Sequence, residues 1–158
     1  GLKAAFGQQS GVAYNTMDYF NVPRFVMTEG FGDIERFQMI ANAMPIPAYD
    51  IQPEKKNLNV NEAQFGFSLP DYAEQIIQTL SCFISGQGKA DIKKIGSSRI
   101  EIRPDLPIED ERIRINCTAN TGTLEEPEWR WFGMLYSLTP EYNSAPEETA
   151  QNSVQQQD

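Results

Sequence analysis

The chain has 158 residues and a mass of 17.9 kDa, and its 13 Lys and Arg against 22 Asp and Glu give a net charge of −9. This length suits one ordinary domain with flanking segments. The acidic charge argues against binding to nucleic acid or an anionic membrane surface. No apolar run approaches the roughly 18 residues of a membrane span, so we also expect no membrane insertion.

The sequence contains no histidine and only two cysteines. Serine–histidine and cysteine–histidine nucleophile pairs are therefore excluded within this chain, as are the usual catalytic zinc sites that depend on imidazole. We expect this chain alone to be no enzyme and to hold no cofactor. The first residues carry no secretory signal, so an exported parent protein would carry one upstream.

Residues 1–56 are expected to form an N-terminal arm. Residues 3–11 have the composition of one strand and its exit loop, and an irregular, aromatic-rich stretch follows. A helix is predicted from its cap, Asp33, to the stop at Pro45, because Ile34, Phe37, Ile40, Ala41 and Met44 fall on one stripe. The proline-rich segment 45–53 is expected to be a stiff linker.

From residue 57 the hydrophobic period changes to two. Apolar and polar residues alternate over 65–69, 80–85, 99–103 and 112–117, and an aromatic segment covers 129–138, with turn residues between them. Short alternating strands at such intervals predict a mainly β fold, an antiparallel immunoglobulin-like β-sandwich over 57–139. Residues 140–158 are rich in Glu, Gln, Asn and Ser, and we expect a disordered tail.

The two cysteines lie on predicted inward faces. Cys82 shares its face with Leu80 and Ile84, and Cys117 shares its face with Ile113 and Ile115. Two inward cysteines on different strands can meet as a disulfide across the core, if the protein occupies an oxidising compartment. The alternative is two buried free thiols that act as small apolar residues.

The last predicted strand carries aromatic residues on both faces. Trp129, Trp131 and Leu135 share one side, while Arg130, Phe132, Met134 and Tyr136 share the other. An exposed aromatic ring can stack on a sugar, with an arginine bonding its hydroxyls. Trp129, Arg130, Trp131 and Tyr136 are therefore candidate contacts for carbohydrate or a partner. The alternative is a central strand buried on both sides.

Several short motifs together are similar to one protein family. They are Phe-Gly-Gln-Gln-Ser-Gly at 6–11, Val-Pro-Arg-Phe at 22–25, Phe-Gly-Asp-Ile-Glu-Arg-Phe at 31–37, Leu-Ser-Cys-Phe-Ile-Ser-Gly-Gln-Gly at 80–88, Arg-Ile-Asn-Cys-Thr at 114–118 and Trp-Arg-Trp-Phe at 129–132. As a set, they resemble the C-terminal region of Gram-negative polysaccharide deacetylases, relatives of the family four carbohydrate esterases.

This resemblance implies a modular parent protein. An upstream catalytic barrel would hold an Asp–His–His site for a divalent metal such as zinc, and would hydrolyse N-acetyl amide bonds on a glycan of the periplasm or cell envelope. The chain has no Asp-Asp-Gly-Pro string and no histidine, so no catalytic or metal residue is carried over. Residues 3–11 would be the last strand of the barrel and its exit loop. The rest would be a non-catalytic accessory domain that docks on the barrel and contacts polysaccharide.

Two other classes of function stay open at this stage. One is a free-standing β-sandwich that serves as an interaction or structural module with no sugar role. The other is an enzyme that works with carboxylates from the acidic loops at 105–111 and 125–128. The oxygen-rich loop at 105–111 also has the ligand type that calcium prefers, although it lacks the order of an EF-hand.

Overall fold

The computed structural model describes residues 1–15, 17–58, 64–108 and 110–138. Its helical elements are α1 (Ile34–Ala41), the short 3₁₀ helix η1 (Asp71–Ala73) and α2 (Glu74–Thr79). Its strands are β1 (Met44–Pro45), β2 (Tyr49–Gln52), β3 (Asn57–Leu58), β4 (Phe65–Ser68), β5 (Ser81–Ile84), β6 (Gly88–Lys89), β7 (Asp91–Ile95), β8 (Arg99–Arg103), β9 (Arg112–Asn120) and β10 (Trp129–Leu138). The expected tail, 140–158, lies outside the described residues.

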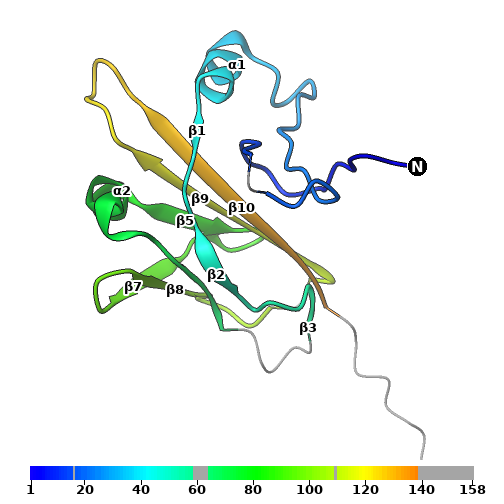
Figure 1. Ribbon diagram of the computed structural model, residues 1–158, viewed down its shortest axis with the longest axis vertical. Helices are drawn as coiled ribbons and strands as arrows, with labels where there is room; N and C mark the ends of the chain where they lie inside the picture. Colours follow the sequence, from blue (N-terminus) through cyan, green and yellow to red (C-terminus); the bar gives the residue numbers. More distant parts are fainter. Residues whose placement is uncertain (16, 59–63, 109, 139–158) are drawn as a thin grey trace, which may run out of the picture.

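The strands form two sheets, as Figure 1 shows. One sheet has the order β1-β10-β9-β5-β6, with β3 also paired to β10, and the other has the order β2-β4-β8-β7. All pairs are antiparallel except those of β1 and β3 with β10. The predicted mainly β sandwich, with an N-terminal arm that carries one helix, is confirmed.

The core lies between the two sheets and follows the period-two pattern of the sequence. In β9 and β10, alternate residues are buried, and they face the buried residues of β4 and β8. Two aromatic pairs cross the interface: the ring centroids of Phe65 and Tyr136 are 5.2 Å apart, and those of Phe67 and Phe132 are 5.3 Å apart. Inward alternation from both sheets therefore accounts for the packing.

The segment expected as a linker forms part of the sandwich instead. Met44 and Pro45 pair with β10 in the first sheet, and four residues later β2 pairs with β4 in the second sheet. The chain crosses between the sheets at Ile46, which is buried in the core. Prolines are tolerated here because both strands lie at sheet edges. The range expected as an arm thus contributes two strands.

One edge of β10 is covered only at its two ends. The partner β9 runs along nearly the whole of the other edge, from Trp129 to Ser137. On the open edge, β1 pairs with Arg130 and Trp131, and β3 pairs with residues 137–138. Between these contacts the chain belongs to the second sheet, so the middle of this edge has no neighbouring strand.

Residues 1–15 and 17–32 form an irregular arm instead of a regular strand with a loop. The expected strand at 3–11 is reduced to one parallel bridge between Phe6 and Val22, supported by the hydrogen bonds from the Gly7 amide to the Val22 carbonyl (2.8 Å) and from the Val22 amide to the Ala5 carbonyl (2.9 Å). In Figure 1 this arm lies on the side of β10 that faces away from the second sheet.

Helix α1 is shorter than expected. The Asp33 carboxylate caps it by accepting a hydrogen bond from the Arg36 amide at 2.7 Å, as predicted. The helix ends at Ala41, four residues before Pro45, because Met44 and Pro45 are drawn into the sheet. A second helix, α2, was not anticipated. In the described part of the chain, no helix is long and apolar enough to cross a bilayer.

Candidate functional site

The structure separates the four candidate contact residues of β10 into different environments. Tyr136 is 0 % exposed and packs in the core, so its ring cannot reach a carbohydrate, and the expectation for this residue is wrong. Its hydroxyl lies 3.6 Å from the Met134 sulfur. Arg130 is half-buried, and its Nε donates to Thr121 Oγ1 at 3.2 Å. Only the two tryptophans present their rings on the outer face.

Trp129 and Trp131 line two different hollows. Trp129 is half-buried in a shallow groove of about 280 Å³ that it shares with α1, lined also by Glu35, Gln38, Met39, Asn42 and Pro127. Trp131 packs edge-to-face on Phe25 of the arm, with ring centroids 5.1 Å apart. Its indole N–H is buried and has no hydrogen-bond partner among the described residues. Burying a hydrogen-bond donor without a partner costs free energy, so we describe the residues that surround this N–H group.

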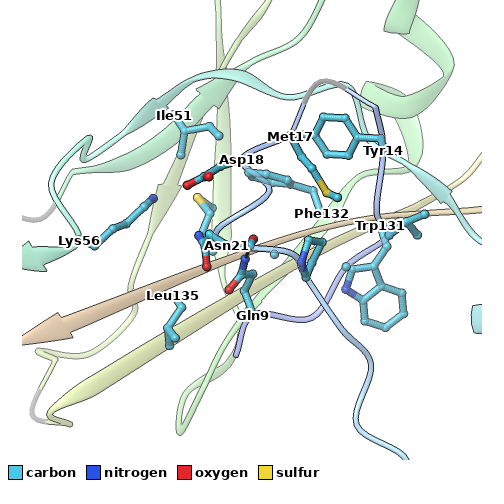
Figure 2. A pocket seen from close by; sticks show the side chains of 15 residues that line it. Gln9, Tyr14, Met17, Asp18, Asn21, Ile51, Lys56, Trp131, Phe132 and Leu135 are labelled. Carbon is cyan, nitrogen blue, oxygen red and sulfur yellow. Dashed lines mark hydrogen bonds between the residues drawn. The ribbon is translucent and has the colours of Figure 1, made fainter. Parts of the chain in front are cut away.

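Trp131 borders a cleft of about 250 Å³ that we call the edge cleft (Figure 2). It lies between the arm and the uncovered edge of β10. Five consecutive residues of β10 form one wall, residues of the arm form the other, and Ile51 and Lys56 close one end. The lining residues are Gln9, Gly11, Val12, Tyr14, Met17, Asp18, Asn21, Pro23, Ile51, Lys56 and residues 131–135.

Hydrogen bonds between the two sides of the arm hold its wall of the cleft. The Gln9 side-chain amide donates to the Asn21 carbonyl at 2.7 Å, and the Arg24 amide donates to the Gln9 carbonyl at 3.1 Å. The Arg112 guanidinium, at the start of β9, donates to the Gln8 side chain at 3.1 Å. The first two bonds hold the two sides of the arm together, and the third joins the arm to the first sheet.

Gly133 lets the arm approach β10 closely. A Cβ at this position would overlap the carbonyl oxygen of Ser10 and would lie 3.0 Å from the carbonyl carbon of the same residue. Only glycine accommodates this contact, because any side chain would displace the arm backbone. A glycine within an aromatic strand is the one sequence signal that could have indicated this docking. Gln9, Asn21 and Lys56 carried no comparable signal.

One lysine and one carboxylate give the edge cleft its charge. The Lys56 ammonium lies 4.6 Å from the centroid of the Tyr136 ring, and partial burial lowers the pKa of Lys56. Asp18 Oδ1 accepts the Phe20 amide at 2.9 Å, and the backbone carbonyl of Asp18 accepts the Asn21 amide at 3.0 Å. Figure 2 shows Asp18 and Asn21 across from β10, with Lys56 at the far end from Trp131.

The predicted disulfide is present between Cys82 and Cys117, with Cα atoms 4.0 Å apart. Both residues are fully buried on the inner face of the first sheet, as expected. The bond does not cross the core, however, because the two residues are direct partners on the neighbouring strands β5 and β9. A structural disulfide indicates an oxidising, extracytoplasmic location.

The edge cleft has the composition of a binding site. It combines aromatic and apolar walls with a few hydrogen-bonding groups, which is typical of small-molecule sites. No group of three or more Cys, Asp or Glu residues placed to hold a metal occurs among the described residues. Comparison of the chain with protein-family models, with curated proteins and with solved structures finds no significant match.

Proposed function

We propose that this chain is a non-catalytic accessory domain of a polysaccharide deacetylase, and that it docks on the catalytic barrel of the same parent chain. The parent hydrolyses N-acetyl amide bonds on a glycan in the periplasm or cell envelope of a Gram-negative bacterium. The barrel, not this chain, holds the divalent metal. The motifs spread from residue 6 to residue 132 are the sequence support for this assignment.

The apolar side of α1 carries the proposal. Ile34 is 65 % exposed and Phe37 is 50 % exposed, and no residue of this helix is buried. An amphipathic helix gains most of its stability from burying its apolar stripe, so an uncovered stripe indicates a missing partner surface.

The arm also exposes apolar side chains. Among the described residues, ten exposed large apolar side chains lie between residues 2 and 44, and six lie in the longer remainder of the chain. Those of the arm and α1 are Leu2, Phe6, Tyr19, Phe20, Val26, Met27, Phe31, Ile34 and Phe37, and Met44 of β1 follows them. Such concentrations mark protein interfaces more often than chance exposure. A catalytic domain that precedes this chain would meet the arm first, and the disulfide supports an envelope location.

The coding sequence upstream of Gly1 tests the family assignment. It should encode an Asp-Asp-Gly-Pro motif and two metal-binding histidines, and their absence would remove the assignment. Docking is tested in the parent protein with the double variant Ile34→Ser/Phe37→Ser. We expect lower solubility and a lower thermal midpoint of the catalytic domain, because the variant removes apolar contacts between the two domains.

The matched control for docking is Tyr72→Ser. Tyr72 is 81 % exposed on η1 of the sandwich, so this variant removes a large exposed side chain that lies outside the arm and α1. It should leave the catalytic domain unchanged. Equal effects of the two variants, or no effect of either, would show that α1 does not contact the barrel.

A further inference from the structure

The edge cleft exposes the backbone of β10. In a strand, successive side chains point to opposite faces, so a cleft that lies on one face touches only alternate residues. This cleft is lined by every residue from Trp131 to Leu135. It therefore runs along the edge of the strand, where the backbone N–H and carbonyl groups are.

Hydrogen bonds at both ends show which backbone groups of β10 point into the cleft. The Trp131 carbonyl accepts the Ile46 amide at 3.1 Å, and the Ser137 amide donates at 2.8 Å to the carbonyl just before β3. Backbone direction alternates along a strand, so Gly133 and Leu135 point to the same edge. Among the described residues, none forms a hydrogen bond to the Gly133 carbonyl or the Leu135 amide on this edge. One acceptor and one donor are left for a ligand.

The chain itself closes this edge on both sides of the cleft. Extending the register of β1 places Ile46 opposite Phe132. Extending that of β3 backwards places Lys56 opposite Tyr136. Only the positions opposite residues 133–135 stay open, so a polymer cannot run on along the strand. The cleft volume of about 250 Å³ lies below the range of pockets for drug-sized ligands, and it suits a single small molecule.

One amino acid in the middle of this opening meets both free backbone groups. The strands β1 and β3 run parallel to β10, and a residue placed between them in the same direction lies opposite Met134. In a parallel pair, its nitrogen donates to the carbonyl one position before Met134, and its carbonyl end accepts from the amide one position after. These two groups are the Gly133 carbonyl and the Leu135 amide.

The cleft also contains two side chains of opposite charge. Lys56 closes the end beyond Leu135, and Asp18 lies on the arm wall across from β10 (Figure 2). Neither forms an ion pair with any residue that the structure describes. The Phe20 amide occupies Asp18 Oδ1 and leaves Oδ2 for a ligand. A free amino acid carries both an ammonium group and a carboxylate, so it complements both charges.

The inner side of the cleft is apolar. Residues directly opposite each other in a sheet share a face, so the side chain of the bound amino acid points inward with Met134. The cleft is lined on this side by Phe132 and Met134, which are buried, and by Ile51 of the second sheet. An aliphatic side chain fits these surroundings, whereas a charged one would lose its hydration without gaining a partner.

We propose that the edge cleft binds one free L-amino acid with an aliphatic side chain. Its ammonium group donates to the Gly133 carbonyl and to Asp18. Its carboxylate accepts the Leu135 amide and faces the Lys56 ammonium, and its side chain lies against Met134. Three different walls take three substituents of the α-carbon, so the site selects one enantiomer. This inference goes beyond the proposed function and does not rest on it.

The test uses the full ¹⁵N-labelled chain and L-leucine as the probe. We expect saturable shifts of the Leu135 amide and of the other amides that line the cleft. D-Leucine cannot place all three substituents, and glycine has no side chain to bury, so each should bind at least tenfold more weakly. The absence of saturable shifts with L-leucine, or equal affinity for D-leucine or glycine, would overturn the proposal.

Two derivatives of leucine separate the charged contacts. L-Leucinamide lacks the carboxylate, and N-acetyl-L-leucine lacks the ammonium group. Each should bind at least tenfold more weakly than L-leucine, because one charge-assisted hydrogen bond is lost and the facing charge stays unpaired. Equal binding of either derivative would contradict the assignment. Tighter binding of a tripeptide that ends in leucine would assign the cleft to a peptide C-terminus and would also overturn it.

Neighbouring lysines provide a matched pair of variants. Lys56→Gln removes the cation that faces the carboxylate, so it should weaken L-leucine about tenfold and leave L-leucinamide unchanged. Lys55→Gln removes the same charge from an exposed residue that does not line the cleft, and should change neither. Equal weakening of both ligands by Lys56→Gln, or equal effects of the two variants, would refute the site. These measurements need only this chain, so the proposed function and this site can fail separately.

Discussion

The close approach of the arm to β10 makes Gly133→Ala the most informative perturbation of this fold. The new Cβ would overlap the carbonyl oxygen of Ser10. Because the obstacle is backbone rather than a flexible side chain, the arm must move away from the strand. The φ angle of Gly133 is not in the left-handed region, so alanine itself is compatible with this position.

The sign of the stability change distinguishes contact from open space. Alanine in place of glycine in a strand should stabilise a protein by about 0.5–1 kcal/mol if nothing obstructs it. Forcing an extra methyl group into a packed contact costs about 1–3 kcal/mol. Displacement of the arm also loosens the Phe25–Trp131 contact, which contributes about 0.5–1.5 kcal/mol. We therefore expect Gly133→Ala to destabilise the protein by about 1–3 kcal/mol.

Urea unfolding measures this loss, and hydrogen exchange locates it. Exchange of the amides in 5–24 should accelerate, whereas the amides of β9 should retain their protection. Gly30→Ala is the matched control, because a Cβ on Gly30 would meet no atom within 4 Å. If Gly133→Ala is as stable as this control and residues 5–24 stay protected, the arm does not pack on β10 as described.

Four further outcomes are expected. Reduction of the Cys82–Cys117 bond, which spans 35 residues, should cost about 4 kcal/mol in a chain-entropy estimate, measured as a lower urea midpoint; uptake of two alkylating groups without reduction would show that no bond exists. Burial raises the pKa of Tyr136, so above about pH 10 this phenol ionises in the unfolded chain but not in the folded protein. The free energy of unfolding should therefore fall as the pH rises above about 10. In a series of unfolding midpoints against pH, Tyr136→Phe should show a smaller fall. Amides in 1–44 should exchange sooner than those in 65–138, because α1 buries none of its residues; equal protection would place the arm in the cooperative core. The isolated chain should release no acetate from acetylated chitooligosaccharides or peptidoglycan fragments, with or without added zinc or cobalt, since it has no imidazole ligands; metal-dependent acetate release would contradict this.

The alternation of apolar residues was sufficient to predict the sandwich. Period-two patterns over 80–85, 99–103, 112–117 and 129–138 correspond to β5, β8, β9 and β10, and the first and third of them place Cys82 and Cys117 on inner faces. Such patterns are reliable because one face of each strand must be buried, and a shift by one residue would expose the whole set. The capped start of α1 at Asp33 is equally local, because a cap depends only on nearby residues.

Strand pairing depended on contacts that no local pattern encodes. The cysteines were expected to meet across the core, but a strand order that places β5 beside β9 makes them neighbours in one sheet. The proline-rich stretch 45–53 has the composition of a linker, yet its residues pair with β10 in the first sheet and with β4 in the second. The helix that was expected to reach Pro45 ends earlier for the same reason.

The candidate site itself was decided almost entirely by tertiary structure. From the sequence, the aromatic strand offered Trp129, Arg130, Trp131 and Tyr136 alike as candidate contacts, because an exposed aromatic ring can stack on a sugar. Which tryptophan borders the edge cleft depends on the arm that packs over Gly133. The cleft exists because the chain pairs with one end of β10 as β1, then crosses to the second sheet as β2, and pairs with the other end of β10 as β3. A gap of this kind belongs to the path of the chain between sheets, and the residue types that line it do not determine it.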